Sequence, residues 1–243
     1  MFKRFTVAAL ALMLAGCAAN KGLRTGPSNP AASPWPTDLR VPGKIYRIDE
    51  GQSELRVLIY RAGPLARFGH NHVVLNRSLQ GAAKVAGGRS GFWLNLSAKS
   101  FVVDDAQARR DEGADFAADV PDDAKSGTLE HMLSAAVLDA EEFPEIAVTG
   151  VAEPPGAGPP GAAPPGAAPM RVTVTIHVAG HESTVEATFT LDINSHSLSA
   201  VGSLELRQST LGLIPYSLML GALQVQDALT VKFKIIAVDS TGS

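Results

Sequence analysis

Residues 170–193 read MRVTVTIHVAGHESTVEATFTLDI. Apolar residues, many of them β-branched, alternate here with polar ones, which is typical of β-strands that bury one face. The alternation is interrupted at Ala179-Gly180-His181-Glu182, and a short glycine-containing turn between two such runs predicts a β-hairpin. We therefore expect two antiparallel strands, over residues 170–178 and 184–193.

Similar two-residue periods recur at 45–61, 72–85, 91–103, 145–152, 198–207 and 225–238. Eight strands that each have one apolar face must hide both those faces and their edges, and a closed antiparallel barrel does both. One helix is expected from Thr128 to Leu138, with an apolar stripe formed by Leu129, Met132, Leu133 and Ala136. The predicted fold class is all-β, an eight-stranded antiparallel β-barrel with one short helix, over residues 45–239.

The N-terminal segment has the pattern of an export signal. Two basic residues at positions 3 and 4 precede an apolar run over residues 5–14, about half the length that a membrane-spanning helix needs. The run leads into LAGC at residues 14–17, which resembles the lipobox of bacterial lipoproteins. We expect residues 1–16 to be a signal peptide and Cys17 to carry the lipid.

Two or three acyl chains on Cys17 would anchor the protein stably without a spanning helix. We therefore expect it at the periplasmic face of the cell envelope. Ala18 and Ala19 follow the cysteine where an inner-membrane retention signal often has aspartate, so by resemblance to well-studied envelopes we expect the outer membrane. Residues 17–44 are rich in proline and small polar residues, which predicts a flexible linker with an end-to-end distance of about 30 Å. Residues 154–169, rich in Pro, Gly and Ala, predict an exposed loop inserted between two strands.

Composition excludes several classes of protein. A hydrophobic fraction of 45% against 19% charged residues indicates a chain that fills a core. The formal net charge of −3 and the lack of a Lys/Arg cluster argue against a nucleic-acid partner. Because the chain has a single Cys, the mature domain cannot form an internal disulfide. The sequence also lacks the Gly-x-Ser-x-Gly motif that would indicate a serine hydrolase. We predict a protein that is not an enzyme; its oligomeric state stays open.

Four stretches resemble one known family. They are YRID at 46–49, the segment from His131 to Ile146 that ends in FPEI, VTIHVAG at 174–180, and LRQSTLG at 206–212. In this order they resemble the YceI-like polyisoprenoid-binding proteins. The resemblance implies a lipocalin-like barrel whose apolar tunnel binds or transports an isoprenoid amphiphile, either a polyprenyl lipid or an isoprenoid quinone. It implies no other cofactor.

The tunnel hypothesis needs side chains that face a hollow lumen. We expect them on one face of the predicted strands, at Val57, Ile59, Leu94, Leu96, Val174, Ile176, Phe189, Leu191, Leu204, Val231 and Phe233. The alternative for each is ordinary core packing. A barrel filled by its own side chains would instead serve as an interaction module of the envelope.

Two histidines form the sharpest polar cluster. His70 and His72 are two residues apart, so in a strand both rings project from one face. We expect them to contact the head group of the ligand. The alternative function is metal binding through His70 and His72, with His131, His177 or His181 as a third ligand. The acidic stretch over residues 104–123 predicts a solvated surface loop, because it lacks the spacing of a calcium loop.

Overall fold

The computed structural model describes residues 34–36, 39–40, 42–86, 89–152 and 167–240. The strands are β1 (Lys44–Ile48), β2 (Glu54–Ala62), β3 (His72–Asn76), β4 (Leu79–Ala86), β5 (Arg89–Ser97), β6 (Val102–Val103), β7 (Glu145–Ala152), β8 (Ala167–Val178), β9 (His181–Ile193), β10 (Ser197–Arg207), β11 (Ser217–Leu218) and β12 (Leu223–Asp239). The α-helices are α1 (Ala106–Asp111) and α2 (Asp122–Leu133). The expected signal peptide, Cys17 and most of the insertion lie outside the described residues.

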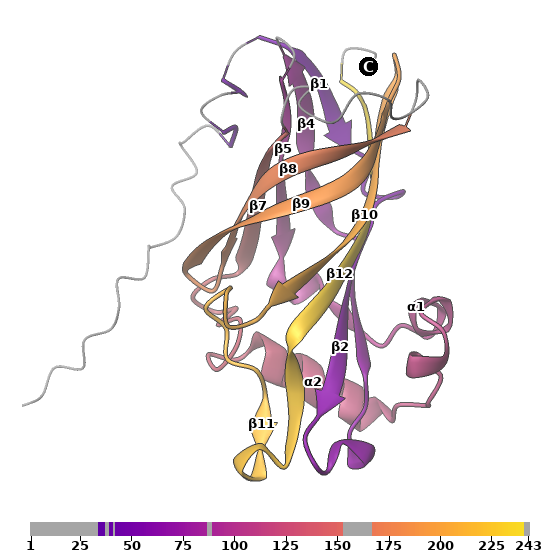
Figure 1. Cartoon of the computed structure of the whole chain (residues 1–243), viewed down its shortest axis with the longest axis vertical. Helices are drawn as coiled ribbons and strands as arrows, with labels where there is room; N and C mark the ends of the chain where they lie inside the picture. Colours follow the sequence, from indigo (N-terminus) through magenta and orange to yellow (C-terminus); the bar gives the residue numbers. More distant parts are fainter. Residues whose placement is uncertain (1–33, 37–38, 41, 87–88, 153–166, 241–243) are drawn as a thin grey trace, which may run out of the picture.

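The strands close into an antiparallel barrel (Figure 1). The hydrogen-bonded order runs β1-β4-β5-β7-β8-β9-β10-β12, and β12 pairs back with β1. β2, β3 and β6 extend β1, β4 and β5, respectively, at the end of the barrel where α2 lies. When β1 with β2, β3 with β4 and β5 with β6 are each counted as one strand, eight strands surround the barrel axis. We call each of these eight strands a stave. The predicted eight-stranded antiparallel barrel is confirmed.

Three of the eight predicted strands are each divided into two shorter strands. The break between β1 and β2 is held by Ser53, whose buried hydroxyl donates to the Ile236 carbonyl at 3.2 Å and accepts from the Ile236 amide at 3.0 Å. Between β3 and β4 the side chain of Asn76 accepts from the Ser78 amide at 2.8 Å. A polar side chain thus replaces missing backbone bonds, and the stave continues beyond the break.

The predicted hairpin forms between β8 and β9, but its turn has two residues rather than four, because His181 and Glu182 already pair within β9. Ala179 and Gly180 have φ values of 49° and 74°, so both central residues lie in the left-handed region that a tight two-residue turn between twisted strands requires. A Cβ at Gly180 would also lie 2.7 Å from the ring of Phe143. The turn therefore needs glycine both for its backbone and for its packing.

The helix prediction was wrong at both ends. α2 begins at Asp122, directly after Pro121, and ends at Leu133 rather than Leu138. Beyond it the chain turns back, because the amides of Leu138 and Ala140 donate to carbonyls of the last helical turn at 3.1 and 3.0 Å. Leu129, Met132 and Leu133 pack against the core as expected, whereas Ala136 is exposed. Among the described residues no helix is long and apolar enough to span a bilayer.

The acidic stretch is not the solvated loop that its composition predicted. The side chain of Asp105 caps α1 by accepting from two amides at 2.9 and 3.1 Å. Phe116 is 2% exposed and packs edge-on against Tyr60, with ring centroids 5.3 Å apart. Asp111 and Glu112 bind the guanidinium of Arg56 at 3.0 and 3.2 Å. The stretch therefore covers the outer face of β2 and β3, held by buried apolar residues between the acids.

The end of the proline-rich segment packs on the barrel wall. Leu39 is completely buried, and its carbonyl accepts from the Lys84 ammonium at 3.1 Å. The same ammonium lies 4.3 Å from the ring centre of Trp35. Gly91 makes room for Leu39, since a Cβ there would lie 2.1 Å from the Leu39 Cδ1 atom. The described part of residues 17–44 is thus attached to β4 and β5.

We expect Leu39→Ala to lower the free energy of unfolding by about 2–3 kcal/mol, because a buried leucine loses most of its apolar contacts. The measurement is urea unfolding of the variant beside the parent chain. Val201→Ala is the control, because Val201 is 48% exposed on β10 and should lose little. Equal losses in the two variants would contradict a docked Leu39.

Candidate functional site

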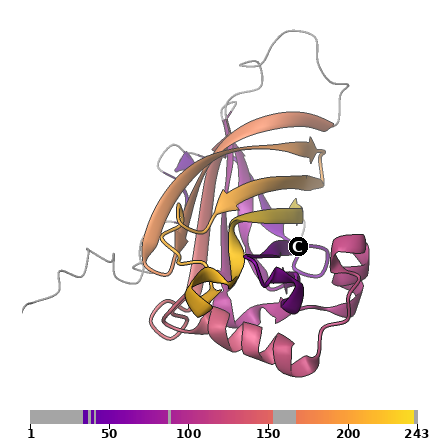
Figure 2. The same cartoon turned by 60° about the horizontal axis from the view of Figure 1, so that its bottom comes forward.

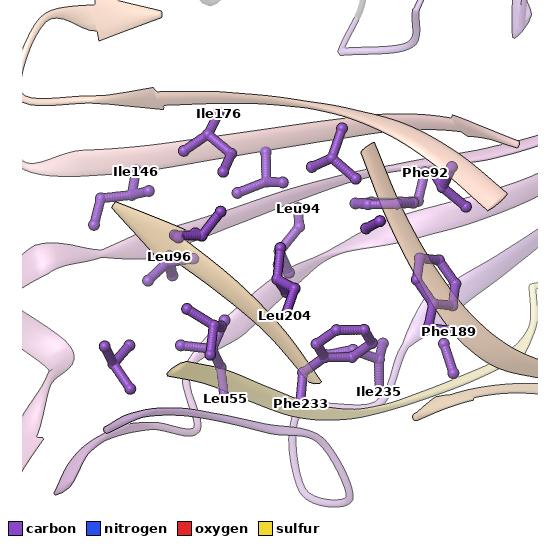
Figure 3. Close-up of a pocket in the computed structure, with 18 of the residues that line it drawn as sticks. Leu55, Phe92, Leu94, Leu96, Ile146, Ile176, Phe189, Leu204, Phe233 and Ile235 are labelled. Atoms are coloured by element: carbon purple, nitrogen blue, oxygen red, sulfur yellow. The ribbon is translucent and has the colours of Figure 1, made fainter. Parts of the chain in front are cut away.

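The barrel encloses a cavity of about 280 Å³ (Figure 3). Its lining extends from Ala237, near the end of β12, to Leu211 and Leu213 in the segment that follows β10. Of the lining residues, Lys84, Ser90 and Gln208 have polar side chains and the others are apolar or glycine. The lumen is therefore a hydrocarbon-lined space that extends along the barrel axis.

All eleven residues proposed for the tunnel line this cavity. Figure 3 shows Leu94, Phe189, Leu204 and Phe233 pointing into a common space from different strands. Strand alternation is the reason, since every second residue of β5 and β8 faces inward. The same alternation could have identified Phe92 on β5 and lining residues on β7, which were not among the candidates.

Other lining residues could not be found from strand periodicity. Met132 belongs to α2, Val137 and Leu138 follow it, and Leu211 and Leu213 lie in the segment after β10. These residues lie at one end of the lumen. Their inward position depends on how the helix and loops pack onto the barrel, which no local pattern encodes.

Two glycines keep room in the lumen for aromatic rings. Phe189 and Phe233 meet edge to face with ring centroids 5.4 Å apart. A Cβ at Gly202 would lie 2.6 Å from the Cβ of Phe189 and 2.7 Å from the ring of Phe233. At Gly150 a Cβ would lie 2.3 Å from the Phe92 ring. The three rings therefore lie directly against glycine backbone.

The polar groups of the lining are few, and two of them are hydrogen-bonded to the backbone. Lys84 donates to the Leu39 carbonyl, as described above, and the side-chain amide of Gln208 donates to the Gln226 carbonyl at 2.8 Å. Among the residues that the structure describes, none of those lining the cavity is His, Cys, Asp or Glu. Contacts to a guest in this cavity would therefore be almost entirely hydrophobic.

Comparison with known proteins places this geometry in a family. The model of the YceI-like domain matches residues 46–237. The chain belongs to the YceI-like family. The match covers all eight staves of the barrel and all lining residues of its cavity, so the predicted family is confirmed.

Two solved structures share the YceI-like fold of this chain. BcnA of Burkholderia cenocepacia has a TM-score of 0.52 and 14% identity, and the match covers 78% of this chain and 99% of that one. A polyisoprenoid binding domain from Saccharophagus degradans, implicated in plant cell wall breakdown, has a TM-score of 0.51 and 12% identity, covering 80% and 98%. A search of curated proteins found no significant match.

The two histidines proposed as head-group contacts do not line the cavity. His72 is 9% exposed, and its Nδ1 atom lies 2.6 Å from the Asp104 carboxylate. Its Nε2 atom lies 3.4 Å from the hydroxyl of Thr128 on α2. His70 is half-buried beside it, with ring centroids 6.1 Å apart. His72 thus connects the barrel to α2.

Asp104 is the centre of a buried ionic network. Its carboxylate accepts from Arg109, from His72 and from the Val73 amide, the last at 2.9 Å. Burial alone would raise the pKa of Asp104, but these hydrogen bonds and the charge of His72 hold it below its usual range. Arg109 also donates to the carbonyls of Asn71 and Ala118, both at 2.8 Å. The network fixes the acidic segment to β3.

The metal-site alternative lacks a third ligand among the described residues. No group of three His, Cys, Asp or Glu side chains that could hold a metal ion occurs there. The three candidates are placed elsewhere: His131 packs against Tyr216 with ring centroids 4.6 Å apart, His177 lies 3.5 Å from Glu182, and His181 packs beside Gly212.

Proposed function

We propose that this protein binds an isoprenoid amphiphile, a polyprenyl lipid or an isoprenoid quinone, with its chain in the barrel lumen. The observation that carries the proposal is the continuous hydrocarbon lining from Ala237 to Leu213. Family membership supports lipid binding, and a structure with the same fold is a polyisoprenoid binding domain.

The driving force is burial of apolar surface. At about 25 cal/mol per Å², a chain that buries several hundred Å² gains on the order of 10 kcal/mol before the costs of association are subtracted. The methyl branches of an isoprenoid chain can pack between the Leu, Val and Ile side chains of the lumen. No covalent step is needed, and we propose binding without catalysis, supported by membership in the YceI-like family.

The head group requires polar contacts at an end of the lumen. Both ring nitrogens of His72 already face partners, Asp104 and Thr128. A head group at His72 would therefore have to displace Thr128. We therefore propose that His70, rather than His72, contacts the head group of the ligand.

We further propose that the protein works at the periplasmic face of the cell envelope, anchored to the outer membrane through lipid on Cys17, and that it transports its ligand there. The lipobox-like sequence at residues 14–17 supports the anchor. The anchor would keep the lumen close to the bilayer in which isoprenoid lipids dissolve.

The test of the proposed function is extraction of lipid from the purified protein. We expect about one isoprenoid molecule per chain, identified by mass spectrometry after organic extraction. A lipoprotein without a barrel, purified from the same membranes, is the control for lipid carried over with the anchor. An extract with only the phospholipids of that control, together with no uptake of added ubiquinone, would contradict the proposal.

A further inference from the structure

The end of the barrel beyond β10 presents apolar side chains to solvent. β11 continues into the 3-10 helix η5 (Met219–Gly221), and Leu220 is fully exposed while Met219 is 68% exposed. Ile214 is 73% exposed just before β11. Phe68, in the 3-10 helix η2 (Ala66–Phe68), is 64% exposed. We call Ile214 to Leu220 together with Phe68 the apolar tip.

The shape of the apolar tip is imposed by the fold. Met219 and Leu220 have φ values of 51° and 58°, a backbone region that bulky residues rarely adopt. The β11–β12 pairing of Leu218 with Leu223 supports this turn on one side. On the other, the Leu65 amide donates to the Ala222 carbonyl at 2.8 Å, which joins the turn to the η2 segment. Two large apolar side chains are thus held outward at the cost of backbone strain.

The two segments that form the apolar tip contain no acidic residue, whereas α2 at the same end of the barrel has the exposed Asp122, Asp123 and Glu130. Residues 61–72 and 208–226 contain no Asp or Glu, but they include Arg61 and Arg67. The guanidinium of Arg67 lies 4.5 Å from the ring centre of Phe68. Exposed apolar side chains beside cationic groups match the boundary between head groups and acyl chains of an anionic bilayer.

The apolar tip and the lumen share one segment of chain. Leu211 and Leu213 line the cavity, and the next residue, Ile214, faces solvent. The ring of Tyr216 packs against His131 of α2, with centroids 4.6 Å apart. Figure 1 shows β11 at the end of the barrel opposite the C-terminus, and Figure 2 shows α2 at this same end. A bilayer that received the tip would lie next to this end of the lumen.

We propose that the apolar tip is a membrane-docking element that inserts into the surface of an anionic bilayer and places this end of the lumen against the acyl chains. Docking itself does not depend on the ligand. The further step, passage of an isoprenoid between bilayer and lumen at this end, rests on the proposed function.

The experiment uses the chain from Ala18 onward, which lacks the expected anchor but retains every described residue. Binding is measured by flotation with vesicles of phosphatidylethanolamine and phosphatidylglycerol. We expect the double variant Met219→Ser/Leu220→Ser to bind at least about tenfold more weakly, because two apolar side chains no longer enter the bilayer. The matched control is Val201→Ser, an exposed apolar residue on the barrel wall. Both variants should unfold at the temperature of the parent.

A second measurement separates docking from ligand binding. Uptake of ubiquinone from detergent micelles should be the same in the double variant and the parent, whereas uptake from vesicles should slow at least about tenfold. If the parent binds vesicles through the tip but takes up no ubiquinone from either source, docking stands and the proposed function fails. Equal vesicle binding by the double variant and the parent overturns docking. Docking is also overturned if the parent does not bind vesicles and instead forms dimers that the double variant cannot form.

Discussion

Replacing Ala187 with tryptophan is expected to weaken isoprenoid binding at least about a hundredfold, or about 2.7 kcal/mol, while the barrel stays folded. Ala187 is buried on β9, lines the cavity and pairs with Val172 of β8. An indole at this position would occupy lumen space that the ligand needs. Overpacking a core costs about 1–3 kcal/mol, and the empty space around Ala187 lowers that cost. Titration with ubiquinone, followed by quenching of protein fluorescence, measures the loss.

The neighbouring Thr188→Trp variant is the matched control. Thr188 is exposed and faces outward, so the same indole on the other face of β9 should leave the affinity unchanged. Tight binding by Ala187→Trp would mean that the ligand does not occupy the lumen. Equal weakening in both variants would point to a general disturbance of β9.

Replacing Asp104 with alanine is expected to lower the free energy of unfolding by about 3–5 kcal/mol, because Arg109 loses a buried counter-charge and His72 loses a hydrogen-bond partner. The carboxylate is completely buried, whereas the side chains of Arg109 and His72 are 9% and 11% exposed. Asp104→Asn should lose less, since the amide oxygen still accepts from the Val73 amide. Denaturant unfolding at neutral pH measures both.

The pH dependence of unfolding provides the specific readout for Asp104. Because its pKa is lower in the folded chain than the ordinary value of 3.8, the unfolded chain binds the proton more readily. The stabilisation is therefore complete above about pH 4 to 5 and is lost as the pH falls through the folded value. The Asp104→Ala variant should lack this part of the acid dependence. Asp119→Ala, an exposed acid in the same segment, should keep it.

The sequence predicted the barrel because its strands have a simple local pattern. Alternation in β8 and β9 specifies which side chains share a face, and closure then makes that face the lumen. Phe189 and Leu204 could therefore be placed without knowledge of tertiary structure. The breaks within staves could not, because the roles of Ser53 and Asn76 depend on the strands beside them.

The errors came from apolar residues isolated among polar ones. Phe116 lies between Asp115 and Asp119, so composition masked its role as the buried anchor of the acidic segment. Leu39 follows several prolines and lies between Asp38 and Arg40, in a stretch without the strand or helix periodicity that would indicate burial. The site of each depends on a complementary surface formed by distant residues, and sequence periodicity carries no information about that surface.

The attachment of Leu39 to the barrel wall limits the orientations that a lipidated chain can take. Sixteen residues, Ala18 to Ser33, separate Cys17 from the first described residue, and fully extended they span at most about 55 Å. β12, with 17 residues, has a contour of about 57 Å. Residues 18–33, when fully extended, therefore have about the same length as the contour of β12. If Cys17 carries the proposed lipid, the molecule can lie along the membrane so that β11 contacts the leaflet that holds the anchor.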